Sequence, residues 1–403
     1  MRILQINASV NSGSTGRIAE DIGKVMLANG HESFIAYGRG NRRSESQLIK
    51  IGSDRDVYLH FLKTVIFDRH AFGSTRATQK LIQEIDRINP DVIGLHNLHG
   101  YYLNIEVLFN YLKNKNIPVL WTLFDCWAFT GHCSYFDNID CKKWIMGCSH
   151  CPKKRFYPSS YLLDNSMKNY EQKRVFFNSL DNLQLLVHSQ WLNSLVEKSF
   201  LKNIKTNVIA SGINLDVFKP TYSELRKKLH LGNKKIILGC ASIWDKRKGL
   251  DDFQQLANLF SDEYQIILVG LNKMQLKQLN KRIIGFERTE SVSQLAELYS
   301  IANVFVNPTY QDNFPTTNLE ALACGTPVVT YNTGGSPEAI DDLTGRVIEK
   351  GNITKLFDCI LEISSLEKSK YIDDCRVRAE KCYNKNDRYS DYLNIYTRMI
   401  EKL

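Results

Sequence analysis

Residues 310–329 read YQDNFPTTNLEALACGTPVV, and they predict the architecture of the chain. An apolar run before them predicts a buried strand, and a second apolar run begins at Pro327 after a Gly-Thr turn. Between the two strands, the sequence predicts a loop that contains Asp312 and a helix that contains Glu320 near its start. The order of strand, helix and strand is typical of a parallel α/β sheet, whose ligands bind at the carboxyl ends of the strands.

The two carboxylates of this stretch lie eight positions apart and suit the hydroxyl groups of a sugar nucleotide. A carboxylate at the start of a helix, as predicted for Glu320, can accept hydrogen bonds from the two neighbouring hydroxyls of a ribose. Asp312 in the preceding loop can hold a hydroxyl of an adjoining sugar. The alternative is that both acids are solvated and that Glu320 only favours the positive end of its helix.

A glycine pair follows the second of these strands. Residues 332–338 read NTGGSPE, so Gly334 and Gly335 precede a helix that starts with a proline. This arrangement predicts backbone N–H groups that are free and directed at one point, which suits a phosphate. An ordinary turn is the alternative interpretation.

A basic segment follows an earlier strand, predicted at residues 235–239. Residues 242–250 read SIWDKRKGL and place three cations side by side. At the carboxyl end of a strand, Arg247 and Lys248 could stabilise a departing diphosphate without a metal ion. The alternative is an exposed basic turn.

Strands and helices alternate along the whole chain, with a break at residues 212–220. Strands are predicted before the break at residues 2–6, 34–37, 91–95, 118–123, 183–187 and 207–210, and after it at residues 235–239, 265–269, 282–284, 303–306, 327–330 and 346–348. The two series predict an α/β protein of two doubly wound Rossmann-like domains, residues 1–213 and 214–385, that face a cleft. Residues 386–403 predict a terminal helix, and packing on the N-terminal domain is one option for it.

Length and composition exclude several classes of protein. The chain has 403 residues, of which 43% are hydrophobic and 24% are charged, as in ordinary globular proteins. No apolar run approaches the roughly 20 residues of a membrane span, and the N-terminus lacks the apolar segment of a signal peptide, so we expect a cytoplasmic protein. The net charge of +9 fits an anionic substrate, an anionic membrane or nucleic acid, and it also fits a solvated surface without a partner.

Taken together, the three segments resemble the C-terminal half of the retaining glycosyltransferases of family 4, which have the GT-B fold. The signature of that family is two glutamates separated by seven residues, and here Asp312 and Glu320 hold the two positions. Lys248 matches a lysine of the family. Ser242 stands where the family usually has an arginine, and Arg247 can compensate for it.

The N-terminal half resembles bacterial members that build exopolysaccharide or O-antigen repeats, such as the colanic-acid enzymes. The glycine-rich loop at residues 12–16 matches the loop after the family's first strand. Residues 95–102, LHNLHGYY, and 121–133, WTLFDCWAFTGHC, match this subgroup. Phe124 is a departure, because family members often carry a histidine there that contacts the donor sugar. The histidines that could take over this role, or could simply be packed, are His96, His99 and His132.

The resemblance implies transfer of a sugar, with retention, from a UDP- or GDP-sugar to a saccharide acceptor that is often lipid-linked. No Asp-x-Asp metal motif stands out, so we expect catalysis without a cofactor. The catalytic residues that it implies are Asp312, Glu320, Lys248 and Arg247. The donor-binding residues are Gly13, Gly16, Ser242, Gly285, Phe286, Asn313, Phe314, Pro315, Thr316, Gly334, Gly335 and Glu338. The candidates for contact with acceptor or sugar are His99, Tyr101, Asp125 and His132.

A lipid-linked acceptor leads us to expect peripheral contact with the anionic inner face of the cytoplasmic membrane. Several basic residues lie near the aromatic residues Phe156 and Tyr157 and could provide this contact. They are Lys153, Lys154, Arg155, Lys168, Lys173 and Arg174. A solvated basic face is the alternative.

Five of the ten cysteines fall within residues 126–152, which we interpret as a cysteine-rich insertion. Cys148 and Cys151 form a Cys-x2-Cys pair, which is typical of half a zinc site, and Cys133 and Cys141 can complete four thiolates. Packed free thiols and one or two disulfides are the alternatives.

Three other functions fit parts of the sequence. The same fold hosts nucleotide-sugar epimerases, which need no acceptor, and Phe124 would also suit a non-catalytic binder of nucleotide sugars. A nucleic-acid-binding zinc protein would explain the cysteines and the charge. It would leave the donor segments unexplained, so we expect no nucleic-acid partner.

Overall fold

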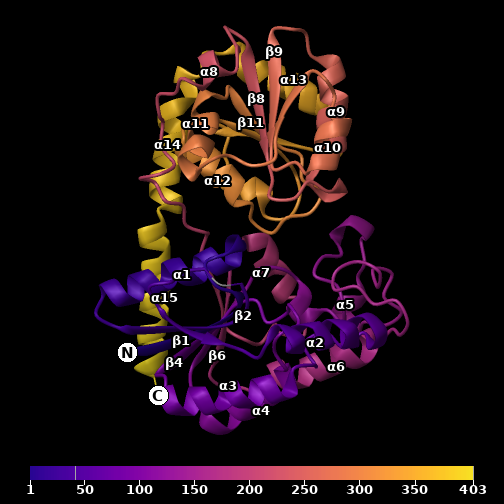
Figure 1. Ribbon diagram of the computed structural model, residues 1–403, viewed down its shortest axis with the longest axis vertical. Coiled ribbons are helices and arrows are strands. Elements are labelled where there is room, and N and C mark those ends of the chain that lie inside the picture. Colours follow the sequence, from indigo (N-terminus) through magenta and orange to yellow (C-terminus); the bar gives the residue numbers. More distant parts are fainter. Residues whose placement is uncertain (41, 403) are drawn as a thin grey trace. The chain divides into compact units, whose positions relative to one another are not determined.

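The computed structural model describes residues 1–40 and 42–402, and it divides into two compact units (Figure 1). The first unit contains Met1–Ile209 and Arg388–Leu403, and the second contains Ala210–Asp387. Each unit is built on one parallel sheet with helices around it. The predicted fold class, two doubly wound Rossmann-like domains, is therefore confirmed. Among the residues described, no helix is both long enough and apolar enough to span a membrane.

The sheet of the first unit has seven strands in the order β3-β2-β1-β4-β5-β6-β7. Every neighbouring pair is parallel. The central strands are buried on both faces, as their mostly apolar sequences predict. The strands are β1 (Arg2–Ser9), β2 (Glu32–Arg39), β3 (Gln47–Lys50), β4 (Val92–Leu95), β5 (Val119–Leu123), β6 (Leu183–Val187) and β7 (Thr206–Val208).

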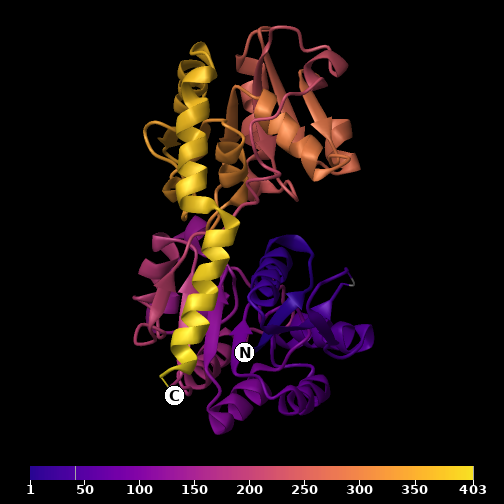
Figure 2. The same cartoon turned by 90° about the vertical axis from the view of Figure 1, so that its left-hand side faces the viewer.

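The helices of the first unit are α1 (Gly13–Ala28), α2 (Asp54–Phe67), α3 (Thr75–Ile88), α4 (Ile105–Lys115), α5 (Lys143–Met146), α6 (Ser166–Phe177) and α7 (Gln190–Val196). Short 3-10 turns lie at η1 (Trp127–Phe129) and η2 (Asp137–Ile139). Helix α15 (Lys385–Ile400) runs beside the sheet of this unit (Figure 2). Its Tyr396 hydroxyl would lie 2.5 Å from a Cβ at Gly94 of β4, so a glycine is needed for this close packing.

The sheet of the second unit has six parallel strands in the order β10-β9-β8-β11-β12-β13. They are β8 (Lys235–Cys240), β9 (Tyr264–Val269), β10 (Ile283–Phe286), β11 (Val304–Asn307), β12 (Val328–Tyr331) and β13 (Gly345–Ile348). The helices are α8 (Leu225–Lys228), α9 (Leu250–Leu259), α10 (Lys273–Gln278), α11 (Val292–Ile301), α12 (Thr316–Ala323), α13 (Ile353–Ser365) and α14 (Ser369–Tyr383), with 3-10 turns η3 (Lys246–Lys248) and η4 (Ser336–Ala339).

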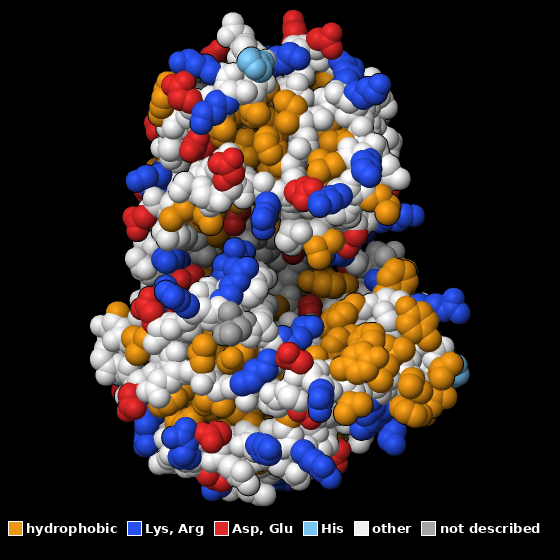
Figure 3. Space-filling view, viewed as in Figure 1, with side chains coloured by type: hydrophobic (Ala, Val, Ile, Leu, Met, Phe, Trp, Pro, Cys, Tyr) orange, Lys and Arg blue, Asp and Glu red, His pale blue; other side chains and the backbone are white. Residues whose placement is uncertain are grey.

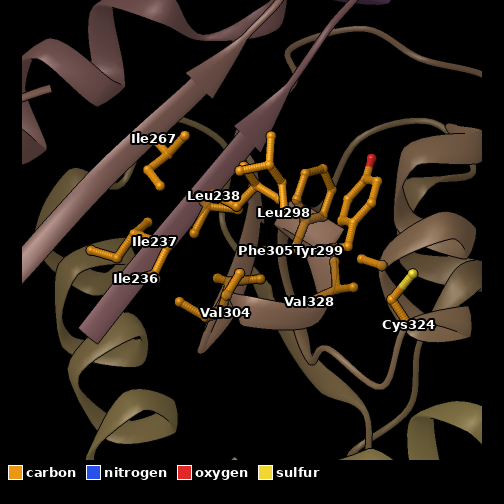
Figure 4. Close-up of a cluster of buried hydrophobic side chains, with 14 of the residues drawn as sticks. Ile236, Ile237, Leu238, Ile267, Leu298, Tyr299, Val304, Phe305, Cys324 and Val328 are labelled. Carbon is orange, nitrogen blue, oxygen red and sulfur yellow. The ribbon is translucent and has the colours of Figure 1, made fainter. Parts of the chain in front are cut away.

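The core of the second unit fixes the strands whose ends carry the predicted site. Leu238 of β8, Phe305 of β11 and Tyr299 of α11 are fully buried and meet in one cluster (Figure 4). Burial of a large apolar side chain contributes roughly 1.5–3 kcal/mol. The positions of the strand ends are therefore set by many such contacts rather than by the loops themselves.

Candidate active site

The three predicted donor segments leave three neighbouring strands of the second unit. Residues 242–250 follow β8, residues 310–315 follow β11, and residues 332–336 follow β12. Because β8, β11 and β12 are adjacent and parallel, their carboxyl ends lie at one edge of the sheet, and the three segments meet there.

Lys248 and Asp312 form an ion pair between the first two segments. The Nζ of Lys248 donates to the Asp312 carboxylate, and the two side chains are only 19% and 16% exposed. The backbone N–H of Lys248 also donates to the Asp245 carboxylate at 3.1 Å, which closes the turn η3. The structure thus brings together two of the four predicted catalytic residues, 64 positions apart in the sequence.

Arg247 joins the basic turn to the loop after β11. Its carbonyl accepts a hydrogen bond from the Tyr310 N–H at 2.7 Å, and its Nη1 donates to the Gln311 carbonyl at 2.9 Å. Gly249 next to it has a φ of +76°, and a Cβ there would lie 2.3 Å from the Pro308 carbonyl oxygen. Only glycine fits this position, because both the backbone conformation and the space exclude a side chain.

Glu320 lies in the second turn of α12, not near its start as predicted, because α12 begins at Thr316. The first-turn effect of the helix dipole therefore does not explain its place. Its Oε2 accepts a hydrogen bond from the buried Tyr299 hydroxyl at 2.9 Å. Burial, and then the negative charge of Glu320, raise the pKa of the Cys240 thiol at the end of β8 to about 12.

The glycine pair supports the Asp312 loop in a way that the sequence did not predict. Gly334 has a φ of +57°, and a Cβ there would lie 1.7 Å from the Asp312 carbonyl oxygen. The Gly335 N–H donates to the Asn313 carbonyl at 2.8 Å, so it is not free for a phosphate as we expected. The segment that follows is the four-residue 3-10 turn η4 rather than a helix.

A buried polar network holds these loops in place. Asn318 of α12 accepts from the Asn307 amide at 2.8 Å, and its own amide donates to the Ser336 carbonyl at 3.2 Å and to the Ser336 hydroxyl at 3.1 Å. Thr330 of β12 shares a hydrogen bond of 2.6 Å with that hydroxyl. The sequence predicted none of these pairings, although buried polar residues need partners.

The other predicted donor residues of this region border the same loops. Asn313 and Phe314 are buried between the loop and the core, Pro315 is the N-cap of α12, and Thr316 is its first residue. Glu338 lies in η4, where its carbonyl accepts a hydrogen bond from Nη2 of Arg378.

A pocket of about 460 Å³ lies at the ends of β8, β9 and β10. Ser242, which is predicted to bind the donor, lines this pocket. Gly285 and Phe286 lie at the end of β10, directly before the lining residues Glu287 and Arg288. Most of the lining residues were not predicted from the sequence, although they directly follow strands or lie in the next turn. The lining residues are Ser242, Ile243, Trp244, Gly270, Leu271, Asn272, Gln275, Glu287 and Arg288.

In the first unit, three of the predicted acceptor residues, His99, Asp125 and Tyr101, lie in one cluster. The Nε2 of His99 is 2.9 Å from the Asp125 carboxylate, and its Nδ1 is 2.8 Å from the Tyr157 hydroxyl. The rings of Tyr157 and Tyr101 lie 6.3 Å apart, so Tyr101 adjoins the same cluster. Trp127 packs against His99 at 5.4 Å. The sequence did not predict Tyr157 or Trp127 in this cluster.

The glycine-rich loop leads into helix α1, and the remaining candidate histidines are buried. Gly13 begins α1 with a φ of +67°, and a Cβ at Gly16 would lie 2.9 Å from the Ser9 hydroxyl. His96 is buried and bonded to Gln5 at 2.8 Å, and burial lowers its pKa to about 3. His132 is fully buried, which corrects its prediction as an acceptor contact.

His132 anchors the cysteine-rich insertion to the end of α2. Its Nδ1 lies 2.5 Å from the Asp68 carboxylate. Burial lowers the pKa of His132, but the hydrogen bond and the charge of Asp68 outweigh burial, and the net effect raises it. Asp68 also accepts from the Asn165 N–H at 2.9 Å. The ion pair therefore joins three distant segments of the chain.

Two of the basic residues predicted to contact a membrane are buried, which corrects that prediction for both of them. Lys153 is 6% exposed and Lys173 is 1% exposed. Lys173 donates to the carbonyls of Trp127 and Thr130 at 2.8 and 3.1 Å, and its ammonium lies 3.4 Å from the centre of the Trp127 ring. Lys173 therefore fixes the loop that follows Asp125.

All ten cysteines are free thiols in the structure. A hydrogen bond between the Cys133 and Cys151 side chains, followed by burial, raises the pKa of Cys133, and the same bond is the main cause that lowers the pKa of Cys151 to about 7. Within the described ranges, no group of three or more His, Cys, Asp or Glu side chains is arranged to hold a metal ion. The zinc site at Cys133, Cys141, Cys148 and Cys151 stays a prediction that needs a direct test.

Metal analysis of the purified protein tests the zinc site. If the four thiolates bind zinc, we expect about one zinc per chain and a lower thermal unfolding temperature after chelation, because structural zinc stabilises small insertions. Substitution of Cys382 by serine, outside the insertion, is the control and should leave the zinc content unchanged. Metal-free protein with unchanged stability would contradict the prediction.

Comparison with known proteins finds a family match within the second unit. Residues 221–381 match the family model described as "Glycosyl transferases group 1". The colanic acid biosynthesis glycosyl transferase WcaC of Escherichia coli K12 is 24% identical over 98% of this chain and 99% of its own. An N-acetylgalactosaminyltransferase of Campylobacter jejuni that acts on N,N'-diacetylbacillosaminyl-diphospho-undecaprenol is 30% identical over 50% of this chain and 57% of its own.

Solved structures share the fold over nearly the whole chain. A glycosyltransferase from Rickettsia africae has a TM-score of 0.71 at 17% identity and covers 100% of this chain and 99% of its own. Anabaena HepE, solved in complex with UDP, has a TM-score of 0.70 at 14% identity and covers 99% of this chain and 100% of its own. At these identities, the likeness shows the fold alone.

Proposed function

The second unit is a group 1 glycosyl transferase domain, and from this premise we propose that the enzyme transfers a sugar from a UDP- or GDP-sugar to a saccharide acceptor in surface-polysaccharide biosynthesis. The observation that carries the proposal is the ion pair of Lys248 with Asp312 at the carboxyl edge of one sheet, with Glu320 in the helix that follows the Asp312 loop. The names of two relatives support a role in surface-polysaccharide biosynthesis. WcaC is named for colanic acid biosynthesis, and a relative in Staphylococcus aureus is named for capsular polysaccharide biosynthesis.

The roles of the residues follow from their charge and position. Glu320 accepts hydrogen bonds from the ribose hydroxyls of the nucleotide. The ammonium of Lys248, with Arg247 beside it, binds the diphosphate and stabilises the charge that develops as this group leaves. When Lys248 turns to the phosphate, it releases the Asp312 carboxylate, which then holds a hydroxyl of the donor sugar. The ion pair seen in the structure would thus be exchanged for two contacts with the donor.

We assign the nucleobase to the 460 Å³ pocket, because it lies beside the basic turn at the same edge of the sheet. We assign the acceptor to the first unit, where His99 and Asp125 offer polar atoms within an aromatic surround. The acceptor is proposed to be lipid-linked, and the reaction to take place on the cytoplasmic side of the membrane with retention of configuration at the transferred sugar.

A screen of nucleoside diphosphates by thermal shift, followed by turnover assays with the donor that binds, tests this function. We expect one of UDP and GDP to raise the unfolding temperature, and we expect donor consumption to depend on an acceptor. Conversion of the donor sugar to an epimer without an acceptor would favour the epimerase alternative. Binding without turnover across a panel of acceptors would favour a nucleotide-sugar binder.

We predict that glycosyl transfer does not require a divalent cation. Lys248 and Arg247 supply the positive charge that a metal ion gives the diphosphate in other enzymes. The initial rate in EDTA should therefore equal the rate in added magnesium within about twofold. A rate that falls to background in EDTA and recovers with magnesium or manganese would contradict this prediction.

A further inference from the structure

The first unit carries an exposed apolar surface that the proposed chemistry does not use. It is made by residues of α2 and of the segment 156–163, and the exposed fractions of these side chains lie between 39% and 68%. We call it the apolar platform and define it as Tyr58, Leu59, Phe61, Phe67, Phe156, Tyr161, Leu162 and Leu163. Figure 3 shows hydrophobic side chains gathered over the part of the first unit that contains α2 and α5. Contiguous exposed patches of this kind mark interaction sites.

Backbone hydrogen bonds make the platform one surface. The N–H of Tyr161 donates to the Val65 carbonyl at 2.9 Å, and the N–H of Leu163 donates to the Ile66 carbonyl at 3.1 Å. The segment 160–163 is therefore fixed along the last turns of α2. Because two separate stretches of the chain present apolar side chains side by side, the platform is more than a set of isolated exposed residues.

Cations border this surface. Arg55 and Lys63 lie on α2, and Arg155 and Lys168 flank the segment 156–163; all four are exposed. The Nζ of Lys154 donates to the carbonyl of Leu162 at 3.3 Å, so one further cation lies against the platform itself. Aromatic and aliphatic side chains with lysine and arginine at their border are typical of surfaces that lie in the interface of an anionic bilayer.

The platform leads to the polar cluster that we assign to the acceptor. The ring of Phe61 packs edge-on against Tyr101 at 5.4 Å. Tyr101 adjoins Tyr157, whose hydroxyl bonds to His99 at 2.8 Å. A molecule with its apolar part at the platform would therefore have its polar part near His99 and Asp125.

We propose that the apolar platform docks the enzyme on an anionic lipid bilayer and so presents the head of a lipid-linked acceptor to His99 and Asp125. The lipid-linked nature of the acceptor rests on the proposed function, whereas the docking itself does not. The platform side chains enter the interface between head groups and acyl chains, and the bordering cations contact the anionic head groups.

Flotation with lipid vesicles tests the docking. The full chain should float with vesicles of phosphatidylcholine and phosphatidylglycerol, and much less with phosphatidylcholine alone. The double variant Phe156→Ser and Leu162→Ser should float roughly fivefold less, because the lost apolar contact sets the binding strength. Leu343→Ser in the second unit is the matched control, since Leu343 is 63% exposed and Leu162 is 68% exposed. This control should float like the parent protein.

Three further variants separate the contributions of charge and apolar contact and guard against misfolding. Arg155→Glu with Lys168→Glu should lower flotation, whereas Lys198→Glu with Lys202→Glu, which makes the same change of charge elsewhere in this unit, should not. Leu162→Trp keeps the platform apolar, so its fluorescence should shift to the blue when anionic vesicles are added. Circular dichroism and thermal unfolding should match the parent for each variant.

Several results would overturn the proposal. The first is that the Phe156 and Leu162 double variant floats as much as the parent, and the second is that the parent does not float at all. The third is that the parent is a dimer and the double variant is not, which would show that a second copy covers the platform. Transfer to a water-soluble acceptor distinguishes the two proposals. Intact transfer without flotation contradicts the docking alone, and intact flotation without transfer contradicts the proposed function alone.

Discussion

Substitution of Lys248 or of Glu320 by alanine is expected to lower the turnover of glycosyl transfer at least tenfold. Each variant loses a charge-assisted contact with the donor, and such contacts contribute about 1.5–3 kcal/mol. Since about 1.4 kcal/mol corresponds to a tenfold change in rate, the loss should lie between tenfold and roughly a hundredfold. The measurement is the initial rate of nucleoside diphosphate release at saturating acceptor.

Neighbouring side chains provide the controls. Lys246 lies in the same basic turn and is exposed, so Lys246→Ala should change the rate by less than about twofold. Glu320→Gln keeps the shape of the side chain and tests its charge alone. Glu320 accepts a hydrogen bond from the buried Tyr299 hydroxyl, so its replacement can also destabilise the fold. The thermal unfolding temperature of each Glu320 variant must therefore be measured beside its rate. Near-normal rates in both alanine variants would mean that the donor binds elsewhere.

The variant Gly334→Ala is expected to weaken donor binding at least tenfold and to destabilise the second unit. The new Cβ would lie 1.7 Å from the Asp312 carbonyl oxygen, so the Asp312 loop or the turn after β12 must move. Displacement of this loop separates Asp312 and Lys248, on which donor binding depends. The left-handed backbone at this position adds about 1–2 kcal/mol of strain for alanine. The KM for the donor and the thermal unfolding temperature measure the two effects.

Gly232→Ala is the matched control for this substitution. Gly232 lies in the same unit with a φ of +53°, close to the +57° of Gly334, but a Cβ there meets no atom within 4 Å. Both variants carry the backbone strain, and only Gly334→Ala carries the steric clash. The control should therefore lose some stability and keep the KM of the parent. Equal KM values for the two variants would show that the Asp312 loop does not depend on Gly334.

The fold was largely predictable because its strands are buried on both faces. Strands such as β4, β5 and β8 read as short, mostly apolar runs, which are typical of a parallel sheet. Strand β3 was not predicted. It lies at the edge of the first sheet, and its side chains are mostly exposed, so its sequence carries no such run.

The site could be predicted only for residues whose location follows from their place directly after a strand. The convergence of Lys248 and Asp312 follows from the order of the strands, and the sequence indicates it through the residues after each apolar run. Contacts between distant segments have no such signal. The bond from Gly335 to Asn313, the pairing of His132 with Asp68 and the burial of Lys173 each depend on tertiary packing that a single sequence does not display.

Helix α15 has a consequence for how the polypeptide matures. Tyr392, Tyr396 and Met399 belong to one buried cluster with Ile3 and Val92, so part of the apolar surface of the first sheet is covered by residues that follow the whole second unit in the chain. During synthesis, this apolar surface therefore stays exposed until the second unit has been made and helix α15 has emerged from the ribosome. A chaperone that shields that surface in the interval would raise the yield of native enzyme.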